Sequence, residues 1–326
     1  MKTITIKILL ACIATIIFSN LKAQEYALVI HGGAGVIMED LMPENIQEEY
    51  KIKLDEALML GDSLLKAGGK CTEVVARVIN VMEDSPLFNA GKGAVFTNKG
   101  KNELDASIME GATLNAGAIA GVTDIKNPIC AAREVMENSE HVFLSGKGAS
   151  EFARMQGLQM VPNKYFHTKR RHESLKRLKK RERERENKDN MGTVGCAVLD
   201  MYGNVCAGTS TGGMTNKKFG RIGDSPVIGA GTYANNKTCA VSCTGHGEYY
   251  IRLGFARDIS ALMEYKGLLV EEACREEITK LANMGGTGGV IAIDAKANIA
   301  MEFNTSGMFR GYIKSTGEKE IAIFAD

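Results

Sequence analysis

The sequence predicts an α+β fold in which packed sheets lie between layers of helices. Runs of small and β-branched residues alternate with segments of helical periodicity along the chain. An apolar run, an Asp, a turn ending in Asn and a second apolar run occur in this order at 193–213 and again at 288–307, which is the pattern of two hairpins. Two helical segments separate them, at 248–263 and 268–284. This order predicts facing sheets covered by helices.

The first half of the chain predicts a strand followed by helices and further strands. In "EYALVIHGGAG" at 25–35 we interpret the glycines as a tight turn after the strand, with a structural role for His31. Apolar residues at helical spacing predict a helix at 44–67. The remaining predicted elements are a helix at 72–82, a loop at 83–93, strands at 104–109 and 116–122, and a helix with Asn127 as cap and Pro128 as first residue.

The first 23 residues have the layout of a secretory signal peptide, with early lysines, an apolar stretch and a small residue at Ala23. We expect cleavage before Gln24 and export to the periplasm, with no membrane segment in the mature form. An uncleaved anchor is the alternative, but the apolar stretch at 8–18 is short for a bilayer span of about 20 residues. The same stretch runs on past Cys12, which argues against lipid attachment there.

The net charge of +1 conceals one strongly basic segment. Residues 169–190 contain eleven Lys/Arg and five Asp/Glu, and the first 23 residues add three Lys, which leaves −8 on the rest of the chain. Such an acidic body is a poor nucleic-acid binder, because that affinity comes from a positive face. We interpret 162–192 as a solvated linker, partly helical or disordered, with too few apolar residues to offset its ordering entropy. A nuclear-targeting or nucleic-acid-binding arm is the alternative.

Neither the cysteines nor the histidines form a metal-binding pattern. After the leader the chain has seven cysteines, an odd number with no C-x-x-C pair, and its five histidines lack ligand spacing. Most of the cysteines lie in apolar surroundings, which predicts buried free thiols. We therefore expect no catalytic metal.

The pair Gly192–Thr193 stands where the charged linker meets a predicted strand. A threonine hydroxyl needs a base, and the sequence offers no convincing triad. A cut before Thr193 would supply one, because the freed α-amino group, with a pKa of about 8, lies within reach of the hydroxyl of the same residue. Gly192 has no side chain to obstruct attack on its carbonyl. The alternative is that the pair only turns a linker into a strand.

Six ordered motifs resemble the plant-type asparaginase and isoaspartyl peptidase family of N-terminal-nucleophile hydrolases. The resemblance covers nearly all of the chain after the leader, except the basic linker. It implies a four-layer αββα sandwich, autocleavage into an α subunit (24–192) and a β subunit (193–326) that form one folded domain, and a dimer of these αβ units. The motifs are "HGGAG" at 31–35, "PLFNAGKGAVFT" at 86–97, "ELDASIMEG" at 103–111, "GTVG" at 192–195, "TSTGGMTNKKFGRIGDSPVIGAG" at 209–231 and "CTGHGE" at 243–248.

The resemblance implies roles for individual residues. Thr193 would be the nucleophile and its α-amine the base, while Thr211 would orient the attacking hydroxyl. Arg221 would bind the α-carboxylate of the substrate and Asp224 its α-ammonium group, a division that suits a planar guanidinium and a carboxylate. Without the resemblance, an Arg and an Asp three residues apart would more often form an ion pair that stabilises a turn.

The motif "CTGHGE" completes the implied site. Thr244 and the backbone N–H of Gly245 would form the oxyanion hole, and the carbonyl of Gly247 would help to bind the ammonium group. His246 is expected to pack against neighbours or to face solvent. The loop at 82–92 resembles the segment that holds a structural sodium ion in relatives, through mostly backbone carbonyls at Met82, Glu83, Ser85, Phe88, Ala90 and Lys92.

The activity that the resemblance implies is that of an autoprocessing isoaspartyl peptidase. Thr193 would attack the side-chain carbonyl of a β-aspartyl dipeptide or of L-asparagine and pass through an acyl-enzyme, without a catalytic cofactor. Glycosylasparaginase, which cuts the sugar–asparagine link, is the nearest alternative, but "TSTGGMTNK" and "HGGAG" favour the peptidase branch. A non-catalytic exported protein that binds anionic surfaces through its basic arm is the alternative from another class.

Overall fold

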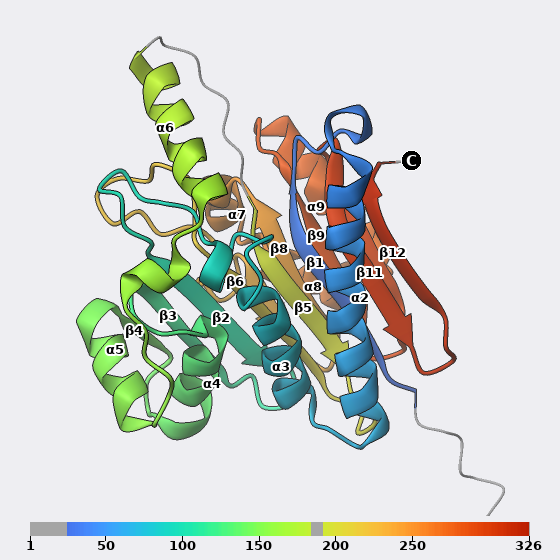
Figure 1. Cartoon of the computed structure of the whole chain (residues 1–326). Coiled ribbons are helices and arrows are strands. Elements are labelled where there is room, and N and C mark those ends of the chain that lie inside the picture. The colour runs from blue at the N-terminus through green and yellow to red at the C-terminus, as the bar shows by residue number, and fades with distance from the viewer. Residues whose placement is uncertain (1–24, 184–191, 326) are drawn as a thin grey trace, which may run out of the picture.

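The computed structural model describes residues 25–183 and 192–325. Two sheets lie face to face, and helices cover the outer face of each (Figure 1). The larger sheet has the order β12 (Lys319–Phe324), β11 (Gly307–Lys314), β1 (Ala27–Gly35), β5 (Val194–Leu199), β6 (Val205–Thr211), β2 (Leu104–Glu110), β3 (Ala116–Val122) and β4 (Phe143–Ser145). The smaller sheet has the order β10 (Ile299–Phe303), β9 (Gly288–Asp294), β8 (Cys239–Gly245) and β7 (Thr232–Ala234). The αββα sandwich is confirmed.

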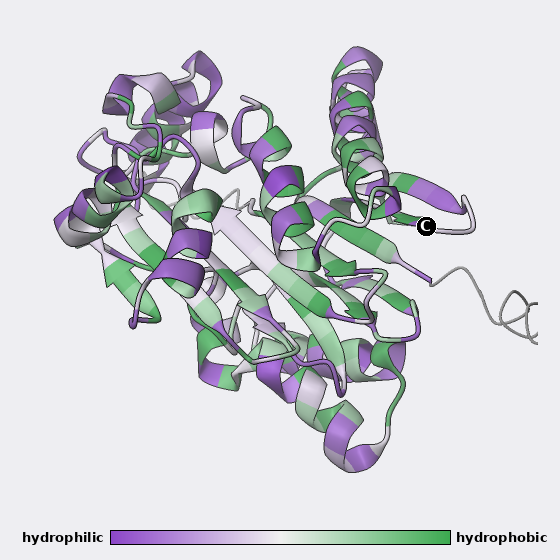
Figure 2. Ribbon diagram, turned by 90° about the horizontal axis from the view of Figure 1, so that it is seen from below, coloured by the Kyte–Doolittle hydropathy of each residue, from purple (hydrophilic) through white to green (hydrophobic). Residues whose placement is uncertain are grey.

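Helices form the two outer layers. The larger sheet is covered by α2 (Glu44–Lys66), α3 (Cys71–Glu83) and α4 (Pro128–Asn138), with α5 (Gly146–Met155) beside β3 and β4. The smaller sheet is covered by α8 (Phe255–Lys266) and α9 (Val270–Asn283), preceded by the short α7 (Gly247–Leu253). Figure 2 shows hydrophobic residues gathered on the strands and polar residues on the helices around them. None of the helices in the described ranges has both the length and the apolar character needed to cross a bilayer.

Two apolar cores fill the spaces between the layers. Leu28 and Ile30 of β1 belong to the core beneath α2 and α3, whereas Ala27 and Val29 belong to the core between the two sheets. This alternation follows from the two-residue period of a strand that is buried on both faces. Strand β1 therefore contributes side chains to both cores. Burying each large apolar side chain stabilises the folded state by about 1.5–3 kcal/mol.

The two predicted hairpins lie in facing sheets, as expected. The β5–β6 hairpin belongs to the larger sheet and β9–β10 to the smaller one. Both turns are held in the same way: Asp200 Oδ1 accepts the N–H groups of Tyr202 and Asn204, and Asp294 Oδ1 accepts those of Lys296 and Asn298, at 2.8–2.9 Å. An Asp that binds the backbone ahead of it stabilises a tight turn.

One local prediction was confirmed in position but not in its capping hydrogen bond, and another was wrong. Asn127 does precede α4, and Pro128 is its first residue, but the Asn127 side chain bonds Asp84 instead of capping the helix; Glu83 Oε1 accepts the N–H of Ile129 at 3.0 Å. The "HGGAG" segment is not a turn but the end of β1, with a bulge between His31 and Gly33. Its glycines permit close contact: a Cβ at Gly32 would lie 2.4 Å from the Phe88 ring, and Gly33 has φ +111°.

The basic segment is more ordered than predicted. Residues Lys169–Arg183 form helix α6, which rises from the top of the molecule beside the loops near 90–100 and 212–222 (Figure 1). Its Leu175 and Leu178 side chains are buried, so the segment does contain apolar residues that offset its ordering entropy. The predicted leader lies outside the described residues, as does part of the predicted linker. The single helix predicted at 248–263 is divided into α7 and α8 at Gly254, whose φ is +61°.

Candidate active site

Thr193 directly precedes β5, a central strand of the larger sheet, and is almost fully buried. The Nδ1 atom of His31, on the neighbouring β1, lies 3.1 Å from the Thr193 carbonyl oxygen. Since a carbonyl can only accept, Nδ1 carries the hydrogen, and Nε2 must accept from Ser242 Oγ at 2.9 Å. Burial lowers the pKa of His31 to about 3, so the ring is neutral. The predicted structural role of His31 is therefore to hold the backbone of Thr193.

The Thr193 hydroxyl faces a second threonine. Thr193 Oγ1 lies 3.1 Å from Thr211 Oγ1, at the end of β6. Thr211 Oγ1 accepts the N–H of Gly213 at 3.0 Å and lies 3.3 Å from the carbonyl oxygen of Gly192. The structure thus brings together Gly192, Thr193 and Thr211, the three residues that the resemblance places at the reacting bond.

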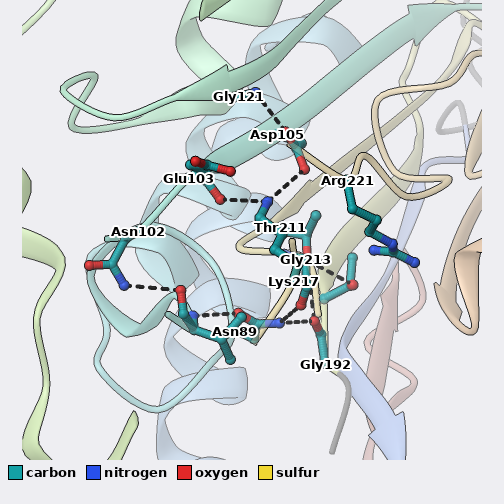
Figure 3. A network of polar contacts seen from close by, with 12 residues as sticks. Asn89, Asn102, Glu103, Asp105, Gly121, Gly192, Thr211, Gly213, Lys217 and Arg221 are labelled. Carbon is teal, nitrogen blue, oxygen red and sulfur yellow. Dashed lines mark hydrogen bonds and ion pairs between the residues drawn. The ribbon is translucent and has the colours of Figure 1, made fainter. Parts of the chain in front are cut away.

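Asn89 is a site residue that the sequence analysis missed. Its Nδ2 donates to the carbonyl oxygens of Gly192 at 2.6 Å and Gly213 at 2.8 Å, and its Oδ1 accepts the N–H of Val95 at 2.9 Å (Figure 3). All three partners fix the amide in one orientation. The available signal in the sequence was a single amide side chain in the glycine-rich loop "PLFNAGKG". We call Asn89, Gly192, Thr193 and Thr211 the threonine side of the site.

The end of β1 connects Thr193 to Thr244. A Cβ at Gly33 would lie 3.1 Å from the Thr193 nitrogen, and the next N–H, of Ala34, donates to Thr244 Oγ1 at 3.4 Å. Gly245 follows Thr244 at the end of β8. The predicted hydroxyl and N–H donors are therefore near the predicted nucleophile, across one strand of backbone.

Arg221 and Asp224 approach the same end of β8. A Cβ at Gly247 would lie 2.8 Å from Asp224 Oδ1 and 3.0 Å from Arg221 Nη2, so only glycine fits between them. Arg221 also forms a bidentate ion pair with Glu248, through Nε at 2.8 Å and Nη2 at 2.7 Å, and these hydrogen bonds lower the pKa of Glu248. Glu248, the last residue of "CTGHGE", is a second neighbour that the sequence analysis gave no role. We call Arg221, Asp224, Thr244, Gly245 and Gly247 the arginine side.

Asp224 carries a buried carboxylate oxygen, Oδ2, that is not hydrogen-bonded to the described residues. Burial raises the pKa of Asp224 to about 7, although the charge of Arg221 acts in the opposite direction. A cationic group placed against Oδ2 would favour the ionised carboxylate.

A buried ion pair supports the loop between the two sides. Lys217 Nζ lies 3.6 Å from Asp105 Oδ2 and donates to the carbonyl of Glu103 at 3.1 Å (Figure 3). A Cβ at Gly213 would lie 3.0 Å from Lys217 Nζ. Asp105 pairs with Thr211 across β2 and β6, so the pair fixes the turn that carries Thr211 and Gly213.

The loop predicted to hold sodium is closely packed against its own backbone. A Cβ at Gly91 would lie 2.3 Å from the Glu83 carbonyl oxygen, and one at Gly93 would lie 2.0 Å from that of Phe88. Only glycine fits at these two positions of the loop, because the backbone oxygens lie so close to them. Glu83 Oε2 is buried without a hydrogen-bond partner in the part of the chain that is described. Lys92 directs its ammonium group over the Tyr165 ring, at 5.8 Å, so only its backbone is available to the loop.

The remaining predictions concern His246 and the cysteines. His246 packs beside the Tyr249 ring, and its Nδ1 lies 3.3 Å from Thr287 Oγ1, which agrees with a packing residue. The seven cysteines of the described ranges are free, and all but the half-buried Cys130 are buried, as predicted.

Two facing sheets between helices, with a threonine at the head of a central strand, define the class of N-terminal-nucleophile hydrolases. The profile of the asparaginase family matches residues 24–323. The chain belongs to this family. It is 48% identical over 294 residues to the isoaspartyl peptidase of Escherichia coli (strain K12), covering 87% of this chain and 92% of that one. It is 42% identical over 325 residues to a probable isoaspartyl peptidase/L-asparaginase 2 of Arabidopsis thaliana (92% and 99%) and 40% identical over 309 residues to a plant-type L-asparaginase of Pyrococcus horikoshii (90% and 98%).

Proposed function

We propose that the chain is an autoprocessing isoaspartyl peptidase with L-asparaginase activity. The names of its relatives support this substrate class. The observation that carries the proposal is the environment of one peptide bond: the Thr193 hydroxyl lies beside Thr211, and the carbonyl that precedes it is held by Asn89.

Maturation begins when Thr193 Oγ1 attacks the Gly192 carbonyl carbon. The C–N bond breaks as the C–O ester forms, and the proton from the hydroxyl ends on the Thr193 nitrogen. Water then hydrolyses the ester, which leaves a carboxylate on Gly192 and a free α-amine on Thr193. Asn89 stabilises the negative charge that develops on the Gly192 oxygen, since it already donates to that atom at 2.6 Å.

Hydrolysis uses the same hydroxyl with the new amine as its base. Arg221 binds the α-carboxylate of the substrate, and Asp224 with the Gly247 carbonyl binds the α-ammonium group. Thr193 Oγ1 attacks the side-chain carbonyl, whose oxyanion accepts hydrogen bonds from Thr244 and the N–H of Gly245. The amine or ammonia leaves with a proton from the Thr193 α-amine, and water clears the aspartyl ester.

Three further features belong to this proposal. The leader directs export to the periplasm, and two αβ units associate into a dimer. The loop at 82–92 binds a structural sodium ion through the carbonyls of Met82, Glu83, Phe88 and its neighbours, which rigidifies the loop that carries Asn89. The buried carboxylate oxygen Glu83 Oε2, which has no hydrogen-bond partner among the described residues, supports this assignment.

The substrate class is tested by comparing kcat/KM for a β-aspartyl dipeptide, L-asparagine and a glycosyl-asparagine. We expect the β-aspartyl dipeptide to be hydrolysed fastest and the glycosyl-asparagine slowest. A preference for the glycosyl-asparagine would reassign the chain to the glycosylasparaginase branch.

A further inference from the structure

The basic helix α6 is attached to the loop that carries Asn89. Arg171, in its first turn, donates from Nε to the carbonyl oxygen of Gly93 at 2.8 Å and from Nη2 to that of Leu87 at 3.2 Å. These two oxygens stand at the two ends of the loop at 87–93. A guanidinium presents its donors in a rigid plane, so one side chain holds both ends of the loop at a fixed separation.

A second contact acts on the same loop. Tyr50 of α2 donates its hydroxyl hydrogen to the Leu87 carbonyl at 2.9 Å, and Arg170 Nη1 donates to the Tyr50 oxygen at 3.0 Å. The Leu87 carbonyl therefore accepts hydrogen bonds from Tyr50 in the body of the protein and from Arg171 in the linker helix.

The other face of this loop contacts the candidate cleavage site. Asn89, two residues after Leu87, donates to the Gly192 carbonyl. The cavity beside this peptide is lined by Gly33, Asn89, Gly192, Arg170 and Arg171. The linker helix, the loop and the Gly192–Thr193 peptide are thus in one continuous set of contacts.

We infer that Arg171 is a positioning residue for cleavage of the Gly192–Thr193 bond. By holding the ends of the loop at 87–93, it keeps Asn89 aimed at the Gly192 oxygen, where charge develops during attack. The basic linker then contributes to the rate of cleavage and does not serve only as a spacer. Helix α6 precedes Gly192 in sequence, and its Leu175 and Leu178 are buried, so it stays with the α subunit after the cut. This inference rests on the proposed autocleavage.

The test is the rate at which full-length chain is converted into two fragments, followed by intact mass after cell-free synthesis. We expect Arg171→Gln to slow conversion about 10- to 100-fold, in the range of a lost charge-assisted hydrogen bond. Arg171→Lys, which keeps the charge and one donor, should recover part of the rate. Arg177→Gln is the matched control, since Arg177 is an exposed arginine of the same helix, and it should convert like the wild type.

A double-mutant cycle separates positioning from general loss of structure. If Arg171 acts through Asn89, Arg171→Gln should change the rate less than threefold in an Asn89→Ala background. Tyr50→Phe removes one hydroxyl from the same loop with little risk to folding, and it should slow conversion about threefold. A rate within twofold of the wild type in Arg171→Gln, or fully additive effects of Arg171→Gln and Asn89→Ala, would overturn the inference. A wild-type chain that is never cut would overturn the proposed function as well, so the two failures are distinguishable.

Discussion

The threonine side and the arginine side of the site differ in how completely their polar atoms are partnered. On the threonine side the Gly192 carbonyl accepts from Asn89, with the Thr211 hydroxyl 3.3 Å away, and the Thr193 carbonyl accepts from His31. On the arginine side, Asp224 Oδ2 is buried without a hydrogen-bond partner among the described residues, and Arg221 is occupied by Glu248. Among the described residues, the threonine side is complete within the chain, whereas on the arginine side Asp224 Oδ2 is left without a partner.

This difference matches the two reactions proposed for Thr193, cleavage of the chain and hydrolysis of a small substrate. A buried polar atom without a partner costs about 1–3 kcal/mol, and a ligand ammonium beside Asp224 would recover that free energy. The threonine side already holds a carbonyl, that of Gly192, next to the attacking hydroxyl. The intact chain therefore supplies the hydrogen-bond partners of its own Gly192–Thr193 peptide, whereas the partner of Asp224 would come from a bound substrate. Variants on the threonine side should affect maturation, and variants on the arginine side should affect only hydrolysis.

The largest effect is expected for Thr193→Ala, which removes the nucleophile of both reactions. The chain should remain uncut, and hydrolysis of L-asparagine should fall at least about 10⁴-fold. Thr193→Ser keeps the hydroxyl and should retain part of both activities. Ammonia release and intact mass measure the two outcomes, and an active Thr193→Ala protein would exclude the mechanism.

A large effect confined to maturation is expected for Asn89→Ala. Loss of one donor to a developing oxyanion lowers a rate by about 10²–10³-fold, so full-length chain should accumulate. Asn98→Ala is the control, because Asn98 is an amide of the next loop that bonds Asn216 and not the Gly192 carbonyl. If Asn89→Ala is cut at the wild-type rate, the threonine side is not organised around the Gly192 carbonyl.

The converse effect is expected for Asp224→Asn. Removing the charge that pairs with the substrate ammonium should lower kcat/KM by about 10²-fold, since a desolvated charge pair is worth about 2–5 kcal/mol, mainly through a higher KM. Cleavage should proceed at the wild-type rate, because the arginine side has no role in it. Slow cleavage of Asp224→Asn would remove the distinction between the two sides.

The smallest effect is expected on the pH dependence of Tm, and it concerns Glu83, which lies next to the threonine side. Glu83 is buried, its Oε1 accepts from Ser210 at 2.6 Å, and burial raises the pKa of Glu83 to about 8. The folded state then keeps a proton that the unfolded chain releases near pH 4.5. The contribution of Glu83 to the free energy of unfolding is therefore complete below that pH and is lost as the pH rises through about 8. Glu83→Gln should reduce the decline of Tm over this range without changing the cleavage rate.

The sodium proposal adds a condition to this measurement. A cation in the loop at 82–92 would favour the ionised Glu83 carboxylate, so the decline of wild-type Tm should be shallower in sodium chloride than in choline chloride. Equal declines in the two salts would argue against sodium in this loop. Equal declines in the wild type and Glu83→Gln would show that Glu83 does not titrate with a raised pKa.

What could be predicted from the sequence was the local periodicity and the motif order. The two hairpins and most helix positions followed from these, whereas the grouping of Thr193 with Thr211 and of Arg221 with Asp224 was implied by the resemblance to the asparaginase family. The errors arose where a contact joins distant segments. The glycines of "HGGAG" predicted a turn because their partners, Phe88 and Gly192, are 50 or more residues away in sequence.

Two other features depend on tertiary contacts in the same way. Asn89 has three partners at the site, but a lone amide in a glycine-rich loop does not show which carbonyl it will meet. Leu175 and Leu178 are only two apolar residues in a charged run, and their burial requires the surface on which α6 packs. Composition alone therefore predicted a solvated linker where the structure has a docked helix.

The most direct test of the central claim is the intact mass of the purified, active wild-type protein. The account predicts two chains, the smaller of which begins at Thr193. N-terminal sequencing of that chain should begin Thr-Val-Gly-Cys. A single fully active chain, with the bond between Gly192 and Thr193 unbroken, would contradict the account.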